Sequence, residues 1–414
     1  MRLSVRSSGL LLFAAWFAIP LCAQQSSIST SSKVSPLGRM RLRNRAANGS
    51  GAAEALTAPG TPHWSTDYKF LDETGLEGHS AVYDQTTNTM IVFAGLSAAL
   101  AFEDTNAVLL NTPVTGSGLW STLIANGTAG SPPARDSHSA IYDSANNRMI
   151  IFGGAVFSSG ASLNDVWVLS NANGQGGIPN WTQLSPSGAP PAARSQHTAV
   201  YDPVNNVMTV FGGDDSNGLA LTDAWVLTNA NGLGGTPVWA KLSPTGALPA
   251  GVVAHTSVYD AANNIMTVFS GANSKITSGT NGVYTLSHAN GLGGIPVWTR
   301  IVANGAVGSP PKRFASAAVY DPANNRMIIF GGGLIPDPQT GPGGLNDAWV
   351  LSNANGLGGT PVWTRLRPTA GPPGSRYFHT AVYDSVNNLM VIFGGNNDES
   401  VYFIAWILSD ANGL

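Results

Sequence analysis

The chain has 414 residues, of which 43% are hydrophobic and only 10% are charged, and its formal net charge is -3. This balance excludes disorder over most of the chain, because disordered segments combine low hydrophobicity with high charge. A nucleic-acid partner is not expected either, since phosphate binding needs a basic surface. The chain contains 49 glycines and 26 prolines, where average composition would give about 30 and about 20. It therefore has many turns between short elements, and long helices are not expected.

The first 23 residues have the features of a secretory signal peptide. Arg2 and Arg6 precede an apolar stretch at 10–21, and Ala23 offers a small residue for cleavage. The apolar stretch is shorter than the roughly 20 residues that span a bilayer, so we expect no membrane span. We expect an exported protein, either periplasmic or extracellular. A lipid anchor through Cys22 is the weaker alternative, because a bulky leucine precedes this cysteine.

Residues 24–60 are predicted to form a flexible linker, because they are rich in Ser, Ala and Gly and poor in large apolar residues. The only cysteine precedes residue 24, so disulfides cannot stabilise a chain cleaved there. The linker also carries a basic run, which could instead contact an anionic surface such as a cell envelope. The basic residues are Lys33, Arg39, Arg41, Arg43 and Arg45.

Residues 61–414 repeat a unit of about 60 residues. Its most regular feature is a Tyr-Asp pair, whose tyrosines are 58 to 63 residues apart. The six repeat tyrosines are Tyr83, Tyr142, Tyr201, Tyr259, Tyr320 and Tyr383. The chain therefore has six structural units.

Each unit contains four short apolar runs that predict strands. In the third unit these runs are at 197–201, 208–211, 224–227 and 238–242. The Asp-Pro-Val-Asn-Asn between the first two runs favours a tight reversal of the chain, since Asp and Asn stabilise turns. Each unit is therefore expected to be a four-stranded antiparallel sheet.

The fold class that we predict is all-β, a six-bladed β-propeller. The strands show little alternation of apolar and polar residues, which is typical of sheets covered on both faces, as in blades packed around an axis. The sixth unit lacks its fourth strand, and residues 60–64 match residues 235–239 at four of five positions. We therefore expect an N-terminal strand to complete the last blade and close the ring, because open sheet edges are usually avoided.

The unit resembles the kelch repeat in the form found in bacterial exported proteins. The resemblance rests on the paired glycines after the second strand, the aromatic residue in the third and the tryptophan in the fourth, and it covers residues 64–414. It implies a kelch-type propeller related to the central domain of galactose oxidase. Kelch propellers include protein-binding modules, sugar-handling enzymes such as sialic acid mutarotases, and copper oxidases, so fold alone does not assign a function.

A histidine stands four residues before five of the six repeat tyrosines, and a tryptophan begins five of the fourth strands. We expect both sets to hold blades together, because a single active site would need only one or two of them. The remaining unit, the fifth, has Ser316 at this position instead. The histidines are His79, His138, His197, His255 and His379, and the tryptophans are Trp120, Trp181, Trp239, Trp298 and Trp363.

The predicted ligand-binding site lies on the face that carries the loops between second and third strands, the variable-loop face. Arg135, Arg194, Arg313 and Arg376 stand seven residues before a repeat tyrosine and are expected at this face, where a guanidinium can bind a carboxylate. The alternative is that each arginine only binds loop carbonyls of its own blade. The carboxylates expected nearby are Asp214, Asp215, Asp337, Asp398 and Glu399.

Two functions remain open. The first is an interaction module that binds a protein segment or a glycan on the variable-loop face. The alternative is a carbohydrate-active enzyme, epimerase-like or mutarotase-like, in which loop carboxyls transfer protons. Its candidates stand outside the repeat pattern and are Glu77, Glu103, Asp104, Asp337 and Glu399.

Cofactor chemistry is not indicated by the sequence. A copper-radical oxidase would need a cysteine crosslinked to tyrosine, and none follows residue 23. Metal-ligand spacings and phosphate-binding loops are also absent from the sequence, so we expect no metal and no cofactor. We expect a monomer.

Overall fold

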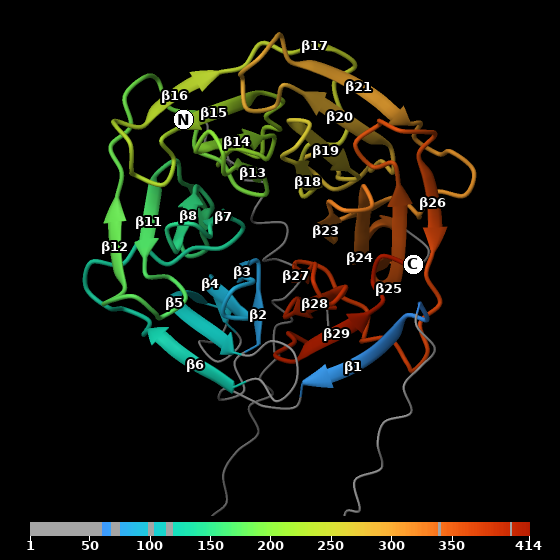
Figure 1. The fold of residues 1–414 in the computed structure, drawn as a ribbon, viewed down its shortest axis with the longest axis horizontal. Coiled ribbons are helices and arrows are strands. Elements are labelled where there is room, and N and C mark those ends of the chain that lie inside the picture. Colours follow the sequence, from blue (N-terminus) through green and yellow to red (C-terminus); the bar gives the residue numbers. More distant parts are fainter. Residues whose placement is uncertain (1–59, 68–74, 98–102, 113–118, 338–340, 398–399) are drawn as a thin grey trace, which may run out of the picture.

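The computed structural model describes residues 60–67, 75–97, 103–112, 119–337, 341–397 and 400–414. The predicted signal peptide, nearly all of the predicted linker, Asp398 and Glu399 lie outside these residues. The described residues form strands and turns without a helix, and the sheets are arranged as six blades around an axis (Figure 1). The predicted six-bladed propeller is confirmed.

Every blade has four antiparallel strands, ordered from the axis to the rim. The innermost strands are β3 (Ser80–Asp84), β7 (Ser139–Asp143), β13 (Thr198–Asp202), β18 (Thr256–Asp260), β23 (Ala317–Asp321) and β27 (Thr380–Asp384). The second strands are β4 (Thr89–Ser97), β8 (Arg148–Phe152), β14 (Val207–Phe211), β19 (Ile265–Phe269), β24 (Arg326–Asp337) and β28 (Leu389–Phe393). The third strands are β5 (Glu103–Thr112), β11 (Val166–Ser170), β15 (Ala224–Thr228), β20 (Val283–Ser287), β25 (Gly341–Ser352) and β29 (Ala405–Ser409).

The fourth strands form the rim of the ring. They are β6 (Leu119–Ile124), β12 (Asn180–Gln183), β16 (Val238–Lys241), β21 (Val297–Val302), β26 (Val362–Arg365) and, in the sixth blade, β1 (His63–Asp67). Five two-residue strands add to these sheets or to the loops: β2 (Leu76–Glu77), β9 (Ala155–Val156), β10 (Ala161–Ser162), β17 (Thr245–Gly246) and β22 (Arg313–Phe314).

The N-terminal strand closes the ring, as the sequence predicts. β1 pairs antiparallel with β29, from His63 opposite Ser409 to Asp67 opposite Ala405. Trp64 is buried and its ring packs edge-on against Phe330 of the fifth blade, with centroids 5.1 Å apart. The first and last segments of the propeller therefore share one blade (Figure 1).

The hairpin after each innermost strand is built around its buried aspartate. Asp202 Oδ1 accepts hydrogen bonds from the backbone N–H groups of Val204 and Asn205, which confirms the predicted turn chemistry. The other oxygen, Oδ2, accepts from the amide of Asn290 in the next blade. The same bond recurs at four other seams, so the asparagine that ends each x-Ala-Asn loop holds neighbouring blades together.

The seams between blades are filled by aromatic residues, as predicted from the repeated tryptophans and histidines. Phe152 ends a second strand and packs against Trp239 and His197 of the next blade, at centroid distances of 5.1 and 5.2 Å. Equivalent tryptophan contacts occur at all six seams. A residue repeated in this way holds blades together, since aromatic side chains bury large apolar areas.

The variable-loop face differs from the prediction in the fifth blade, where a loop is expected between the second and third strands, at 331–345. The strands β24 and β25 instead continue across most of this segment, with Gly332 opposite Leu345 and Leu334 opposite Gly343. The short strand β22 pairs with this extension and satisfies part of the edge that faces the axis. The first blade has the same arrangement, in which β2 pairs with the extended β4.

Candidate functional site

Two belts of backbone hydrogen bonds circle the axis at the variable-loop face. In the inner belt, the residue before each repeat histidine position donates its N–H to the carbonyl of the same residue in the preceding blade, with N···O distances of 2.7 to 3.1 Å. The belt closes on itself through Gly78, Ser137, Gln196, Ala254, Ala315 and Phe378. In the outer belt, the second glycine of each Gly-Gly position donates to the carbonyl at the arginine position of the next blade, over 2.7 to 3.1 Å.

The inner belt puts five residues other than glycine into left-handed backbone conformations. Their φ angles lie between 48° and 55°, a region that costs about 1–2 kcal/mol for an L-residue. The left-handed conformation is most unusual at Phe378, because bulky residues rarely adopt it. Backbone strain of this kind is concentrated at functional sites, so the belt is a candidate binding surface.

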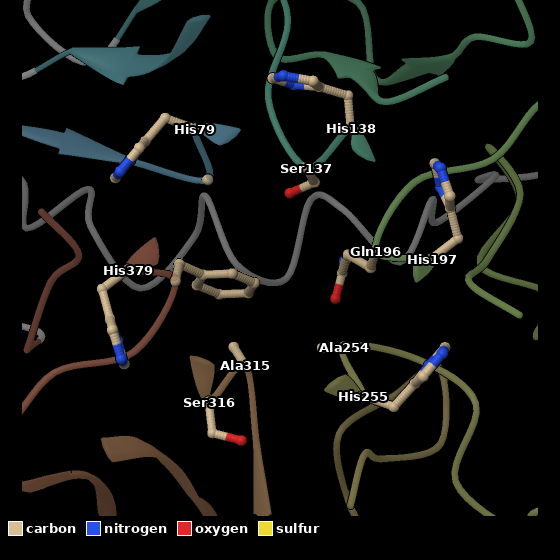
Figure 2. A pocket seen from close by; sticks show the side chains of 12 residues that line it. His79, Ser137, His138, Gln196, His197, Ala254, His255, Ala315, Ser316 and His379 are labelled. Carbon is tan, nitrogen blue, oxygen red and sulfur yellow. The ribbon is translucent and has the colours of Figure 1, made fainter. Parts of the chain in front are cut away.

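The belt surrounds a cavity of about 120 Å³ on the axis, which we call the axial pocket. Its wall is formed by the six belt residues and the residues that follow them, His79, His138, His197, His255, Ser316 and His379. Ser137 and Gln196 present polar side chains to it, whereas Ala254, Ala315 and Phe378 make the other half apolar (Figure 2). The pocket therefore suits a single side chain with a polar and an apolar part.

The histidines of the axial pocket are structural groups. Their rings run around the axis and do not point into its centre (Figure 2), and Nε2 of His138 bonds the Ser80 hydroxyl of the preceding blade at 2.7 Å. The pairs His79 with Thr380, His197 with Ser139 and His255 with Thr198 repeat this bond. Burial lowers the pKa of His79 to about 3 and that of His255 to about 4, so these imidazoles are neutral at ordinary pH.

The predicted arginines are buried inside their own blades. Arg135, Arg194 and Arg313 have no exposed surface, and Arg376 is 1% exposed. Arg135 donates to both oxygens of Asp165, at 2.7 and 2.9 Å, and also to the carbonyls of Pro133 and Gly153. These bonds are those of the alternative, in which each arginine binds groups of its own blade.

Three of the four arginines have a carboxylate partner that also holds a tryptophan. Asp165 accepts a bond from Trp167 Nε1, and the pairs Arg194–Asp223 and Arg313–Asp347 have the same arrangement. Burial alone would raise the pKa of Asp165, but its hydrogen bonds with Arg135 and the charge of that arginine lower it overall. Sequence reasoning missed these partners, although the blades that lack the arginine, one and four, also lack the aspartate and the tryptophan.

Arg376 is the exception. Ile404 occupies the position of the partner aspartate, and within the described ranges no carboxylate pairs with this arginine. Its guanidinium lies over the ring of Tyr402, 4.1 Å from the centroid, and donates to the carbonyls of Gly374 and Gly394. Burial lowers the pKa of Arg376 to about 10, so it remains a buried cation.

Carboxyl groups gather on the side of blades one to three. Burial raises the pKa of Asp136 to about 6, with the charges of Glu77 and Asp214 adding to the effect. Burial also raises the pKa of Asp214 to about 6, with Asp215 adding to it. Asp104, whose Oδ2 accepts the backbone N–H of Phe157 at 2.6 Å, is a neighbour of Asp136.

The structure brings together part of the predicted carboxylate set. Glu77, Asp104 and Asp214 adjoin Asp136, a residue that the sequence did not single out. Asp215 instead stabilises its own loop by accepting from the N–H groups of Asn217 and Leu219. Asp337 ends β24, and Glu103 begins β5; Asp398 and Glu399 lie outside the described residues. The left-handed belt was also missed, because Ser, Gln, Ala and Phe carry no sequence signal for that conformation.

Within the part of the chain that the structure describes, no three His, Cys, Asp or Glu side chains are grouped as metal ligands would be. The described residues also contain no helix that is long and apolar enough to cross a membrane.

Comparison with known proteins finds similarity to β-propellers. The family model of the Attractin/LZTR1 β-propeller matches residues 101–290. The chain is 29% identical over 293 residues, 68% of its length, to the leucine-zipper-like transcriptional regulator 1 homolog of Drosophila melanogaster. It is 27% identical over 288 residues to multiple epidermal growth factor-like domains protein 8 of Mus musculus, and 32% identical over 139 residues to tip elongation aberrant protein 1 of Schizosaccharomyces pombe.

The matched relatives are much longer proteins. The chain spans 26% of the Drosophila protein, 9% of the mouse protein and 11% of the yeast protein. Among solved structures, that of YjhT superposes with a TM-score of 0.58, covering 80% of this chain and 94% of that one. At 16% identity this likeness concerns the fold alone.

Proposed function

Because the chain is a six-bladed β-propeller of the kelch type, we propose that it is an interaction module that binds a protein segment on its variable-loop face. One side chain of the segment enters the axial pocket, and the loops around the pocket hold its neighbours. The observation that carries this proposal is the inner belt, which keeps five strained residues with side chains around a pocket on the axis. Glycine would relieve this strain at each position, so the side chains have a use.

The pocket itself supports a protein segment as the ligand. A cavity of about 120 Å³ is close to the volume of about 150 Å³ of an engineered protein cavity that binds benzene, which is the scale of one side chain. Its two halves match an amphipathic side chain, whose polar tip faces Ser137 and Gln196 and whose apolar part faces Phe378. The amide Oε1 of Gln196 has no hydrogen-bond partner within the described residues, and is therefore available as an acceptor.

Arg376 is the arginine that we retain for contact with an acidic group of the ligand. The other three are neutralised by aspartates, whereas Arg376 is held by two carbonyls and a tyrosine ring. A carboxylate of a bound segment would take the place that Asp165, Asp223 and Asp347 have in the other blades. Such a bond requires the groups that bury this guanidinium, among them the Tyr402 ring, to move when the ligand binds.

The test is a random-peptide display screen against the full chain, followed by affinity measurements on the selected peptides. The variant Gln196→Ala with Phe378→Ala keeps the belt backbone and should weaken selected peptides at least about tenfold, the effect of losing about 1.4 kcal/mol. The control replaces Val204 and Val386 with alanine; both are exposed, on hairpins at the opposite face. Peptides that bind the pocket variant and the wild type equally would contradict the proposal.

A carbohydrate-active enzyme on the same face is the second candidate, favoured by the carboxyl groups of Asp136 and Asp214. Raised pKa values of about 6 suit general acid–base catalysis near neutral pH. A glycan array followed by epimerase and mutarotase assays tests this candidate. Turnover that Asp136→Asn abolishes, in a chain that still folds, would favour the enzyme over the interaction module.

The proposed place of action is outside the cytoplasm. The support is the sequence of residues 1–23, with its basic start, apolar stretch and small residue before Gln24. Expression of the full chain followed by cell fractionation and N-terminal sequencing tests this. Recovery of an uncleaved chain in the cytoplasm would contradict it.

A further inference from the structure

The outer edges of three rim strands are covered by the connection that follows the preceding blade. Ser187 lies parallel to β16, Thr245 in β17 lies parallel to β21, and Thr369 lies parallel to β1. At β16, Ser187 donates its N–H to the Pro237 carbonyl at 2.9 Å and accepts from the Trp239 N–H at 3.0 Å. Thr369 makes the same two bonds at β1. One residue thus satisfies two backbone groups of the exposed edge.

The covering segments share a sequence pattern. Each covering residue follows a proline and precedes Gly188, Gly246 or Ala370, all of which have left-handed φ angles. A Cβ on Gly188 would lie 2.6 Å from the carbonyl oxygen of Trp239, which is closer than van der Waals contact allows. The pattern Pro-x-Gly therefore fits an extended chain that turns away directly after pairing.

The rim strands β12 and β26 have no such cover in the described part of the chain. The connections that precede them are two residues longer between the tryptophan and the arginine position than those after blades two, three and five. The longer connection after blade one folds back onto its own blade, where Asn106 bonds Asn126, Gly127 and Pro132. Asn281 holds the connection after blade four in the same way.

This arrangement leaves a cavity of about 300 Å³ beside β12. Leu123 and Ile124 form one wall, the connection at 125–131 forms another, and 178–181 at the start of β12 form the third. Every residue of the lining is uncharged. Trp181 stands opposite Leu169 in the same register as Trp239 opposite Leu227. The backbone N–H of Trp181 therefore points to the outer edge of β12, as the backbone N–H of Trp239 points to the outer edge of β16.

We propose that the edge of β12 and this cavity form a second binding site, which takes a Pro-x-Gly segment of a protein partner in parallel pairing. The middle residue of the segment donates its N–H to the Pro179 carbonyl and accepts from the Trp181 N–H. The proline packs toward the apolar wall, and the glycine passes the Trp181 carbonyl where a Cβ would not fit. Addition of a strand to an exposed edge is an established mode of peptide recognition, and here the chain's own covering segments supply the geometry. The uncharged lining selects a neutral segment.

The test uses a labelled peptide with the sequence of residues 184–190, Leu-Ser-Pro-Ser-Gly-Ala-Pro, added to the full chain. We expect saturable binding and slower backbone hydrogen exchange at 178–183. Two control peptides each differ from this peptide at one position. One is N-methylated at the second serine, and the other has alanine in place of glycine. Each should bind at least about tenfold more weakly, since the N-methyl group removes a backbone hydrogen bond and the alanine Cβ would meet the Trp181 carbonyl.

A matched pair of protein variants tests whether the peptide binds beside β12. Ala129→Trp should fill the cavity and abolish the protection of 178–183. Val307→Trp, at the corresponding exposed position of the connection after blade four, should leave it unchanged. The proposal is overturned if the N-methylated peptide binds as well as the parent peptide, if 178–183 gains no protection, or if a folded chain shows no saturable binding.

Discussion

At the scale of single residues, the arginines show how a polar group becomes part of a blade. Arg313 donates hydrogen bonds to Asp347 and to two carbonyls, and Asp347 in turn accepts a hydrogen bond from Trp349. Blade four has Val252, Gly282 and Tyr284 at the three corresponding positions. The three residues are present or absent together in blades one to five, because each alone would be a buried group without its partner.

Removal of one partner of such a pair should therefore cost more than removal of both. We expect Arg313→Val to lower the free energy of unfolding by about 3–5 kcal/mol, because it leaves Asp347 without its counter-charge. Adding Asp347→Gly, which gives blade five two of the three residues of blade four, should recover part of this loss. Urea unfolding of the two variants and the wild type measures the difference. A double variant that is less stable than the single variant would contradict this account.

The raised pKa of Asp214 predicts a pH dependence of stability. Its folded value of about 6 lies above the ordinary 3.8, so the folded chain holds this proton more tightly than the unfolded chain. The resulting stabilisation is fully present below about pH 4 and is lost as the pH rises through about 6. Asp214→Asn, which can still accept from Ser195, should therefore be more stable than the wild type at pH 8, by up to about 3 kcal/mol. Unfolding at pH 4 should show a much smaller difference between the two chains, and a constant difference across pH would refute the assignment.

At the scale of strands and seams, the fifth blade breaks a pattern that the other blades keep. Ser316 replaces the histidine and Ala317 replaces the following serine or threonine, so His379 of blade six faces a methyl group. Its Nε2 has no hydrogen-bond partner among the residues described. Ser270 stands where most blades have their first glycine, and its hydroxyl bonds the Arg313 carbonyl. A change on one side of a seam is thus matched by changes across it.

The variant Ala317→Ser should restore the missing bond. The new hydroxyl would meet His379 Nε2 as Ser80 meets His138, and we expect about 0.5–1.5 kcal/mol of added stability. Ala318→Ser, one residue along β23 and on the other side of the strand, is the matched control and should give no gain. The measurement is the urea midpoint of each variant. Equal effects of the two substitutions would show that the seam at His379 needs no donor.

The sequence predicts the elements of this fold well and the site less well, for physical reasons. Strand order and ring closure follow from a repeated local pattern, such as the match of 60–64 with 235–239. The burial of Arg135 depends on Asp165, 30 residues further on, and only the joint absence of both in other blades would have revealed the pair. The inner belt depends on backbone angles at Gln196 and Phe378 that no residue type specifies. Local chemistry is visible in a sequence, whereas contacts that the ring imposes are not.

At the scale of the whole molecule, the seam between blades six and one is crossed by the same backbone belts as the others, although Gln85 takes the place of the asparagine that bonds the buried aspartate. Both hydrogen-bond belts cross it, through Gly78 to Phe378 and Gly395 to Leu76. Residue 60 lies against the end of blade six, where a Cβ on Gly60 would be 3.3 Å from the Leu414 carbonyl carbon. The closed ring therefore does not depend on where the first and last strands of the propeller meet.

A circular permutant tests this equivalence. Joining Leu414 to Gly60 through one added glycine reproduces the Leu-Gly-Gly of residues 233–235, and new ends can be opened between Gly234 and Gly235. We expect this permutant of the propeller to fold and to unfold in a single transition near that of the unpermuted propeller, because surface turns of this kind tolerate new termini. Calorimetry measures the transition. A permutant that unfolds in two separate steps would show that the native break position matters.

The pairing of β1 with β29 also has a mechanical consequence. Because His63 stands opposite Ser409, tension between the start of β1 and the end of β29 would load one hydrogen bond after another, from this end of the pair inward. The other blades have no chain end through which such tension could enter. A load applied at the two ends of the propeller would therefore peel the ring open at blade six at a low force, although the same contacts resist heat and denaturant together with the rest of the ring.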